Sequence, residues 1–235
     1  MKYHNFKNEP LPEHTHLDYY ECLAKKVLEE LFPDDFYNLE FADKPDLQNA
    51  EREIGIEVTR AVDQKEERIE KLYNKISHKQ VRNKNKAIET INSSYISHSM
   101  KINGKEIKEP NRYNDGILGG YGQESFDLVL AAFKNKVIKL NEGGYSIFLH
   151  NHLFVYNQIF ANQDMIDEVV MKMNTFQTEY ERKFQKIFVY VPSYLYILNL
   201  LDKKGEIKYI KDSQFGWALY AREKVIEIER TLNKV

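Results

Sequence analysis

The stretch KPDLQNAEREIGIEVT, residues 44–59, decides how the rest of the chain is interpreted. Its second half, from Ile54 to Thr59, alternates between apolar and polar side chains, which is typical of a β-strand with two unlike faces. Glu57 and Thr59 therefore share one face of the predicted strand. The first half contains the turn dipeptide Pro45-Asp46, so a hairpin can bring Asp46 beside Glu57.

Two carboxylates in this stretch, Asp46 and Glu57, are the first candidates for chemistry. Hydrolysis of a phosphodiester needs a divalent cation that activates water and offsets negative charge, and carboxylates are the ligands that hard cations prefer. Glu21, on the first predicted helix, is a third candidate. Ordinary roles fit too, since Glu57 with Thr59 can be the solvated face of an edge strand and Glu21 a solvated helix flank.

The surrounding chain alternates predicted helices and strands. Apolar periodicity and turn residues predict helices at 12–32, 125–140, 163–183 and 215–233, and strands at 36–41, 53–62, 145–155, 186–191 and one or two within 194–211. Residues 42–49 are expected to form a turn that leads into a further extended piece. Thr15 and Asp18 are expected to cap the first helix. This order predicts a single α/β domain, 1–235, with a mixed sheet between helices.

The segments 44–48 and 54–59 together resemble the PD-(D/E)xK signature of the restriction-endonuclease-like nuclease superfamily. The usual order in that family is helix, strand, strand, strand, helix, strand, which the predicted elements repeat. The resemblance implies a mixed central sheet flanked by helices, and a metal-dependent nuclease that hydrolyses phosphodiester bonds of DNA or RNA. It also implies that Asp46 and Glu57 bind Mg²⁺ or Mn²⁺, with Glu21 matching the acidic residue of the first helix.

Position 59 departs from the family pattern, in which a lysine positions or deprotonates the attacking water. A neutral hydroxyl at Thr59 cannot supply that charge. Some members of the superfamily take the lysine from the following helix, where Lys136 lies about 40° from Leu140 and about 60° from Phe133 around the axis. Lys139 lies further out and is a weaker candidate. Lys136 also fits a side chain that reaches to solvent from the edge of the core.

Residues 63–124 are predicted to be an insertion made of a helix and a long loop or hairpin. Between Lys71 and Arg112 there are ten Lys or Arg residues and three Glu, a net charge of +7 in a chain of −2. Such a concentration suits contact with backbone phosphates, although it also suits a solvated helix face. The candidate nucleic-acid-binding residues are Lys79, Arg82, Lys84 and Lys86.

Two functional classes therefore remain open from the sequence: a nuclease, and a catalytically degenerate nuclease-like module that binds nucleic acid or a protein partner. A third interpretation is an accessory protein that shares only the α/β layering. The single cysteine, Cys22, and the absence of a signal-like N-terminus or an apolar span favour a cytoplasmic protein with no membrane partner. A homodimer is left open. His150 and His152 are interpreted mainly as strand residues on alternating positions.

Overall fold

The computed structural model describes residues 11, 15–61, 68, 72, 82–87, 89–90, 100–102, 105–107 and 126–232. The chain divides into two compact units. The larger unit consists of Leu11–Ala61 and Gly122–Val235, and the smaller unit of Met1–Pro10 and Val62–Tyr121. The smaller unit thus covers most of the segment expected to be an insertion.

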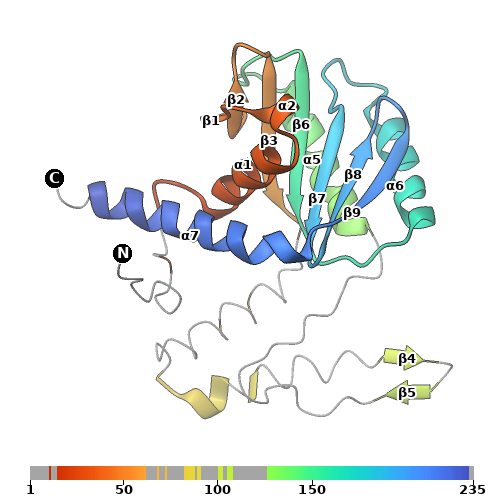
Figure 1. Cartoon of the computed structure of the whole chain (residues 1–235). Helices are drawn as coiled ribbons and strands as arrows, with labels where there is room; N and C mark the ends of the chain where they lie inside the picture. The colour runs from red at the N-terminus through yellow and green to blue at the C-terminus, as the bar shows by residue number, and fades with distance from the viewer. Residues whose placement is uncertain are drawn as a thin grey trace. The chain divides into compact units, whose positions relative to one another are not determined.

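A seven-stranded mixed sheet forms the centre of the larger unit, in the order β1-β2-β3-β6-β7-β8-β9 (Figure 1). The strands are β1 Glu40–Phe41, β2 Leu47–Asn49, β3 Ile54–Arg60, β6 His150–Tyr156, β7 Lys186–Val191, β8 Tyr194–Asn199 and β9 Lys204–Tyr209. Strands β3, β6 and β7 are parallel to one another, and the remaining neighbours pair antiparallel. Strand β3 is therefore an interior strand and not an edge.

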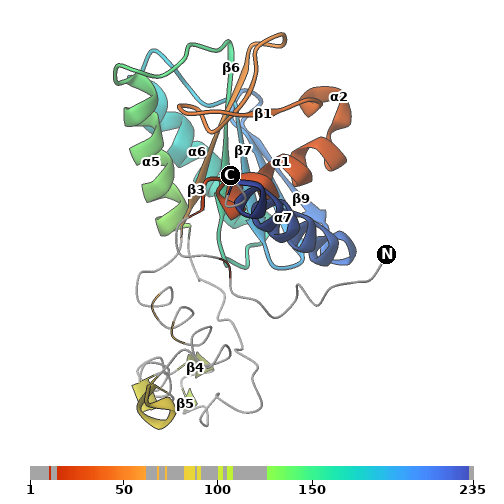
Figure 2. The same cartoon turned by 90° about the vertical axis from the view of Figure 1, so that its left-hand side faces the viewer.

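Helices cover both faces of this sheet (Figure 2). On one face lie α5 Asp127–Asn141 and α6 Gln163–Gln177, which pack with β6, β7 and β8 in one apolar cluster. On the other face lie α1 Tyr19–Leu31, α2 Pro33–Phe36 and α7 Lys211–Leu232, which pack with β3, β7 and β8 in a second cluster. The mixed α/β fold with helices on both sides, predicted from the sequence, is confirmed.

The first helix begins at Tyr19, later than the start near residue 12 that Pro12 and the Thr15–Asp18 pair predict. The side chain of Asp18 accepts hydrogen bonds from the backbone N–H groups of Tyr20 and Glu21, which have no partner within the helix. Asp18 is therefore the N-cap itself. Thr15 lies before the helix and does not cap it.

The predicted strand at 36–41 is also shorter in the structure. Residues Pro33–Phe36 form the short helix α2, because proline is favoured in a first helical turn, and only Glu40–Phe41 pair as β1. The predicted strand at 145–155 begins at His150, and the predicted helix at 163–183 ends at Gln177.

In the smaller unit, β4 Met100–Ile102 and β5 Lys105–Ile107 pair antiparallel as a hairpin, and residues 84–87 are helical. Across the described residues of both units, no helix combines the length and apolar composition needed to cross a bilayer.

Candidate active site

Asp46 is held against strand β3 just before strand β2 begins. In the β2–β3 ladder Leu47 is opposite Ile56. Asp46, one residue before Leu47, is therefore next to Glu57, at the point where the chain enters β2. The Oδ2 atom of Asp46 accepts a hydrogen bond of 2.6 Å from the backbone N–H of Val58. The carboxylate thus takes the place of a main-chain acceptor and is fixed one residue from Glu57.

The close approach of Pro45 to β3 requires glycine at position 55. A Cβ atom on Gly55 would lie 2.7 Å from Cγ of Pro45 and 2.8 Å from Cδ2 of Phe148, closer than packed carbon atoms approach. The backbone N–H of Ser146 also donates to the carbonyl oxygen of Lys44 at 3.0 Å. The segment before β6 is therefore tied to the loop that carries Asp46.

Glu57 lies in the middle of β3 and is only 2% exposed. Nζ of Lys136, on α5, donates a hydrogen bond to its Oε2 atom, and the Lys136 side chain is 18% exposed. The other carboxylate oxygen, Oε1, is buried and has no hydrogen-bond partner among the described residues. The interpretation of Glu57 as part of a solvated edge face is therefore wrong, and Lys136 does more than reach to solvent.

Negative charge is crowded around these residues. Burial, followed by the charge of Glu57, raises the pKa of Asp46 to about 6, although the Val58 N–H and Lys136 act in the opposite direction. Burial, followed by the charges of Asp46 and Asp18, raises the pKa of Glu21 to about 7. Lys136 lowers the pKa of Glu21 and Glu57 raises it, so Glu21, Asp46, Glu57, Asp18 and Lys136 form one set of interacting charges.

Tyr145 is a neighbour of this cluster that the sequence did not indicate. Burial raises the pKa of its half-buried phenol, and the charges of Glu57 and Asp46 and an interaction with the Glu57 carboxylate raise it further. The hydroxyl group therefore keeps its proton and donates toward the Glu57 carboxylate. Its position follows from the Ser146–Lys44 hydrogen bond, which is a long-range contact without a local sequence signal.

The remaining predicted site residues do not join the cluster. Thr59 is half-buried, and its side chain makes no hydrogen bond to Asp46, Glu57 or Lys136. Arg82, Lys84 and Lys86 belong to the smaller unit and are exposed, while Lys79 lies outside the described residues.

Within the described ranges, no group of three or more His, Cys, Asp and Glu side chains is placed to hold a metal ion. Magnesium, however, is commonly bound through only one or two carboxylates, with water and substrate phosphate completing its shell. Asp46 and Glu57 suit that mode of binding, because Glu57 has an unpartnered oxygen and Asp46 has one oxygen beyond its bond to Val58.

Comparison of the chain with protein-family models, with curated proteins and with solved structures found no match.

Proposed function

We propose that the chain is a metal-dependent nuclease of the PD-(D/E)xK type, with Asp46, Glu57 and Lys136 as its catalytic residues. The observation that carries the proposal is the ion pair between the buried Glu57 and Lys136, next to Asp46. Apart from the short helix α2 and the strands β4 and β5 of the smaller unit, the elements follow in the order α1, β1, β2, β3, α5, β6, with β6 parallel to β3, which is the order usual in that superfamily.

Asp46, in the loop before β2, and Glu57, on β3, would hold the cation. A bound Mg²⁺ or Mn²⁺ supplies an activated water and offsets the charge that develops on the phosphate. The raised pKa values of Asp46 and Glu21 support a cation here, because a positive charge would relieve the repulsion among these carboxylates.

Lys136 would take the part of the strand lysine that is missing at Thr59. Its ammonium group is fixed by Glu57 and keeps two further N–H donors, which can orient the attacking water or a phosphate oxygen. Tyr145 would help to hold the Glu57 carboxylate in place, because its protonated phenol donates toward it.

The degenerate binding module is the second candidate function. Thr59 supports it, and so does the engagement of Lys136 by Glu57, which leaves less of the ammonium for catalysis. The two candidates differ in one measurable property, because only the enzyme turns over its nucleic acid.

Purified protein incubated with plasmid, linear and single-stranded DNA and with RNA tests the proposal. We expect cleavage with Mg²⁺ or Mn²⁺, no cleavage with chelator, and background cleavage for Asp46→Asn and Glu57→Gln. Lys136→Met should lower the rate by about 100-fold, as does loss of a group that stabilises transition-state charge, and Lys136→Arg should restore part of it.

Two substitutions serve as matched controls: Lys139→Met, which removes an exposed lysine from the same helix, and Glu179→Gln, which removes an exposed carboxylate. Both should leave the rate unchanged. Cleavage that persists in Asp46→Asn and Glu57→Gln would rule out this active site. Metal-independent binding of nucleic acid without cleavage would favour the degenerate module.

A further inference from the structure

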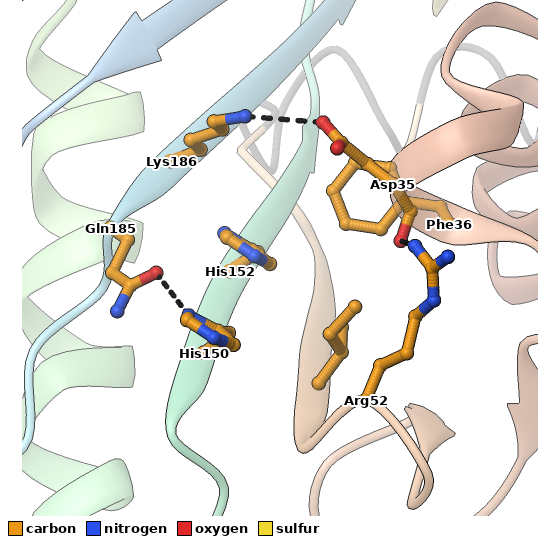
Figure 3. Close-up of a pocket in the computed structure, with 8 residues that line it drawn as sticks. Asp35, Phe36, Arg52, His150, His152, Gln185 and Lys186 are labelled. Atoms are coloured by element: carbon orange, nitrogen blue, oxygen red, sulfur yellow. Dashed lines mark hydrogen bonds and ion pairs between the residues drawn. The ribbon is translucent and has the colours of Figure 1, made fainter.

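A cavity of about 400 Å³ lies at the start of the parallel strands β3, β6 and β7 (Figure 3). Ile54, one of its lining residues, belongs to the apolar cluster with α1 and α2. Glu57, three residues later on β3, points to the other face of the sheet and bonds to α5. The cavity is therefore separate from the candidate active site, and its volume is in the range of small-molecule sites.

Two cationic side chains reach this cavity from opposite sides (Figure 3). Nζ of Lys186 lies 3.4 Å from Oδ2 of Asp35, a loose ion pair that leaves ammonium donors free for a ligand. Nη1 of Arg52 donates to the carbonyl oxygens of Asp34 and Asp35. No hydrogen bond of Nε or Nη2 of Arg52 is found within the described residues, so this guanidinium also has donors left.

Two histidines on β6 line the same cavity, one above the other (Figure 3). His152 is 5% exposed, and its Nδ1 atom has no hydrogen-bond partner in the described part of the chain. Burial, together with the charge of Lys186, lowers the pKa of His152 to about 3, so its ring is neutral at pH 7. A buried ring nitrogen without a hydrogen-bond partner destabilises the fold unless a ligand or a water molecule forms that hydrogen bond.

The second histidine is oriented by its neighbour. Nδ1 of His150 lies 3.0 Å from Oε1 of Gln185, whose Nε2 in turn donates to the carbonyl oxygen of Leu149. Because an amide oxygen only accepts hydrogen bonds, Nδ1 of His150 carries the hydrogen atom. The side chains of His150 and Gln185 are therefore held in place without a ligand.

We propose that this cavity binds a small phosphate monoester, with Lys186 and Arg52 on the phosphate and Asp35 accepting a hydrogen bond from a ligand hydroxyl group. Ammonium and guanidinium groups are the usual partners of phosphate oxygens, and two of them outnumber the single carboxylate. A cation is disfavoured by the same two side chains, and the described residues contain no group of three metal ligands.

Calorimetric titration of the full chain with ribose 5-phosphate, inorganic phosphate and ribose tests the proposal. We expect both phosphates to bind, ribose 5-phosphate more tightly, and ribose not to bind. Lys186→Met should weaken ribose 5-phosphate binding about tenfold or more, as expected for the loss of one charge-assisted hydrogen bond. Lys172→Met, which removes an exposed lysine from α6, should leave the affinity unchanged.

Histidine ring signals in NMR spectra report on ligand binding in this cavity directly. The His152 ring resonances should shift on addition of ribose 5-phosphate in the unmodified protein and in Lys172→Met. Glu57→Gln should bind as tightly as the unmodified protein, which separates this cavity from the nuclease site. Failure of both phosphates to bind, equal affinity in Lys186→Met, or binding of Zn²⁺ in place of phosphate would overturn the proposal.

Discussion

At the scale of single residues, the central feature is a set of carboxylates whose negative charges act on one another. Glu21, Asp46 and Glu57 come from a helix, a loop and a strand, and Lys136 acts on their ionisation in the opposite direction. Repulsion among ionised carboxylates destabilises the folded state. Groups of such perturbed carboxylates are common at catalytic and binding sites.

This repulsion predicts that stability falls as pH rises. The pKa is raised from 3.8 to about 6 in Asp46 and from 4.5 to about 7 in Glu21, so the folded state holds these protons more tightly than the unfolded state. Their stabilising effect is complete below about pH 4 and is lost between about pH 4 and pH 7. Urea unfolding should therefore show that Asp46→Asn with Glu21→Gln gains stability relative to the unmodified protein as pH rises.

If the proposed metal site exists, magnesium should reverse this loss above pH 7, because binding to the ionised carboxylates of the folded protein would raise the free energy of unfolding by mass action. It should have little effect at pH 5 and none in the double variant. Glu179→Gln provides the exposed control. A constant difference between double variant and unmodified protein from pH 4 to pH 8 would contradict the prediction.

At the scale of elements, the site depends on how tightly the loop before β2 packs on β3. Gly55 is the contact point, because a side chain there would overlap Pro45 and Phe148. The backbone position of Asp46 thus depends on a residue that takes no part in the chemistry.

Gly55→Ala should destabilise the fold by about 1–3 kcal/mol, the usual effect of overpacking, and should displace Asp46. The amide resonance of Val58 reports on the hydrogen bond to Asp46 and should shift, while urea unfolding measures the stability. Gly143→Ala is the control, because a Cβ atom there would meet nothing within 4 Å. Equal stability of the two variants would show that the loop adapts.

Much at this scale was predictable from local patterns. Strand β7 occupies Lys186–Val191 as predicted, since it is an apolar run of strand length, and β3 lies within the predicted 53–62, since its side chains alternate between apolar and polar. The start of α1 was not predictable, because Asp18 caps the first turn and the helix begins after it, although Pro12 and Thr15 upstream are also residues typical of a helix start. Cap geometry overrides these signals there.

The candidate site was predictable to a similar degree. The approach of Asp46 to Glu57 follows from a turn and an alternating strand, while Lys136 was suggested by the family resemblance and located by its angle on a helix. Tyr145 could not be predicted, because its position depends on a hydrogen bond between residues about 100 positions apart in sequence, at Ser146 and Lys44. The cavity lined by His152, Arg52 and Lys186 likewise joins segments that no local pattern connects.

At the scale of the whole molecule, the apolar core and the candidate nucleic-acid-binding residues lie in different units of the chain. The larger unit holds both apolar clusters and the carboxylates, while Arg82, Lys84 and Lys86 are exposed in the smaller unit. Contact with nucleic-acid phosphates through that unit stays a prediction.

Simultaneous charge reversal of Arg82, Lys84 and Lys86 to Glu should weaken binding to DNA or RNA regardless of sequence. The dependence of log affinity on log salt concentration should become shallower by about 0.9 for each phosphate of duplex DNA that the variant no longer neutralises. Gel-shift titrations at several salt concentrations measure both effects. Reversal of the exposed Lys139, Lys172 and Lys204 in the larger unit is the control. An equal weakening in both triple variants would indicate only a change in net charge.

The parallel pairing of β3 with β6 has a consequence for synthesis on the ribosome. Ile54 pairs with His150, so β3 leaves the exit tunnel long before its neighbour has been translated. At typical elongation rates the wait is roughly 5 to 20 s. Throughout that interval the edge of β3 that will pair with β6 has no partner strand, and unpaired strand edges of this kind favour aggregation and chaperone binding.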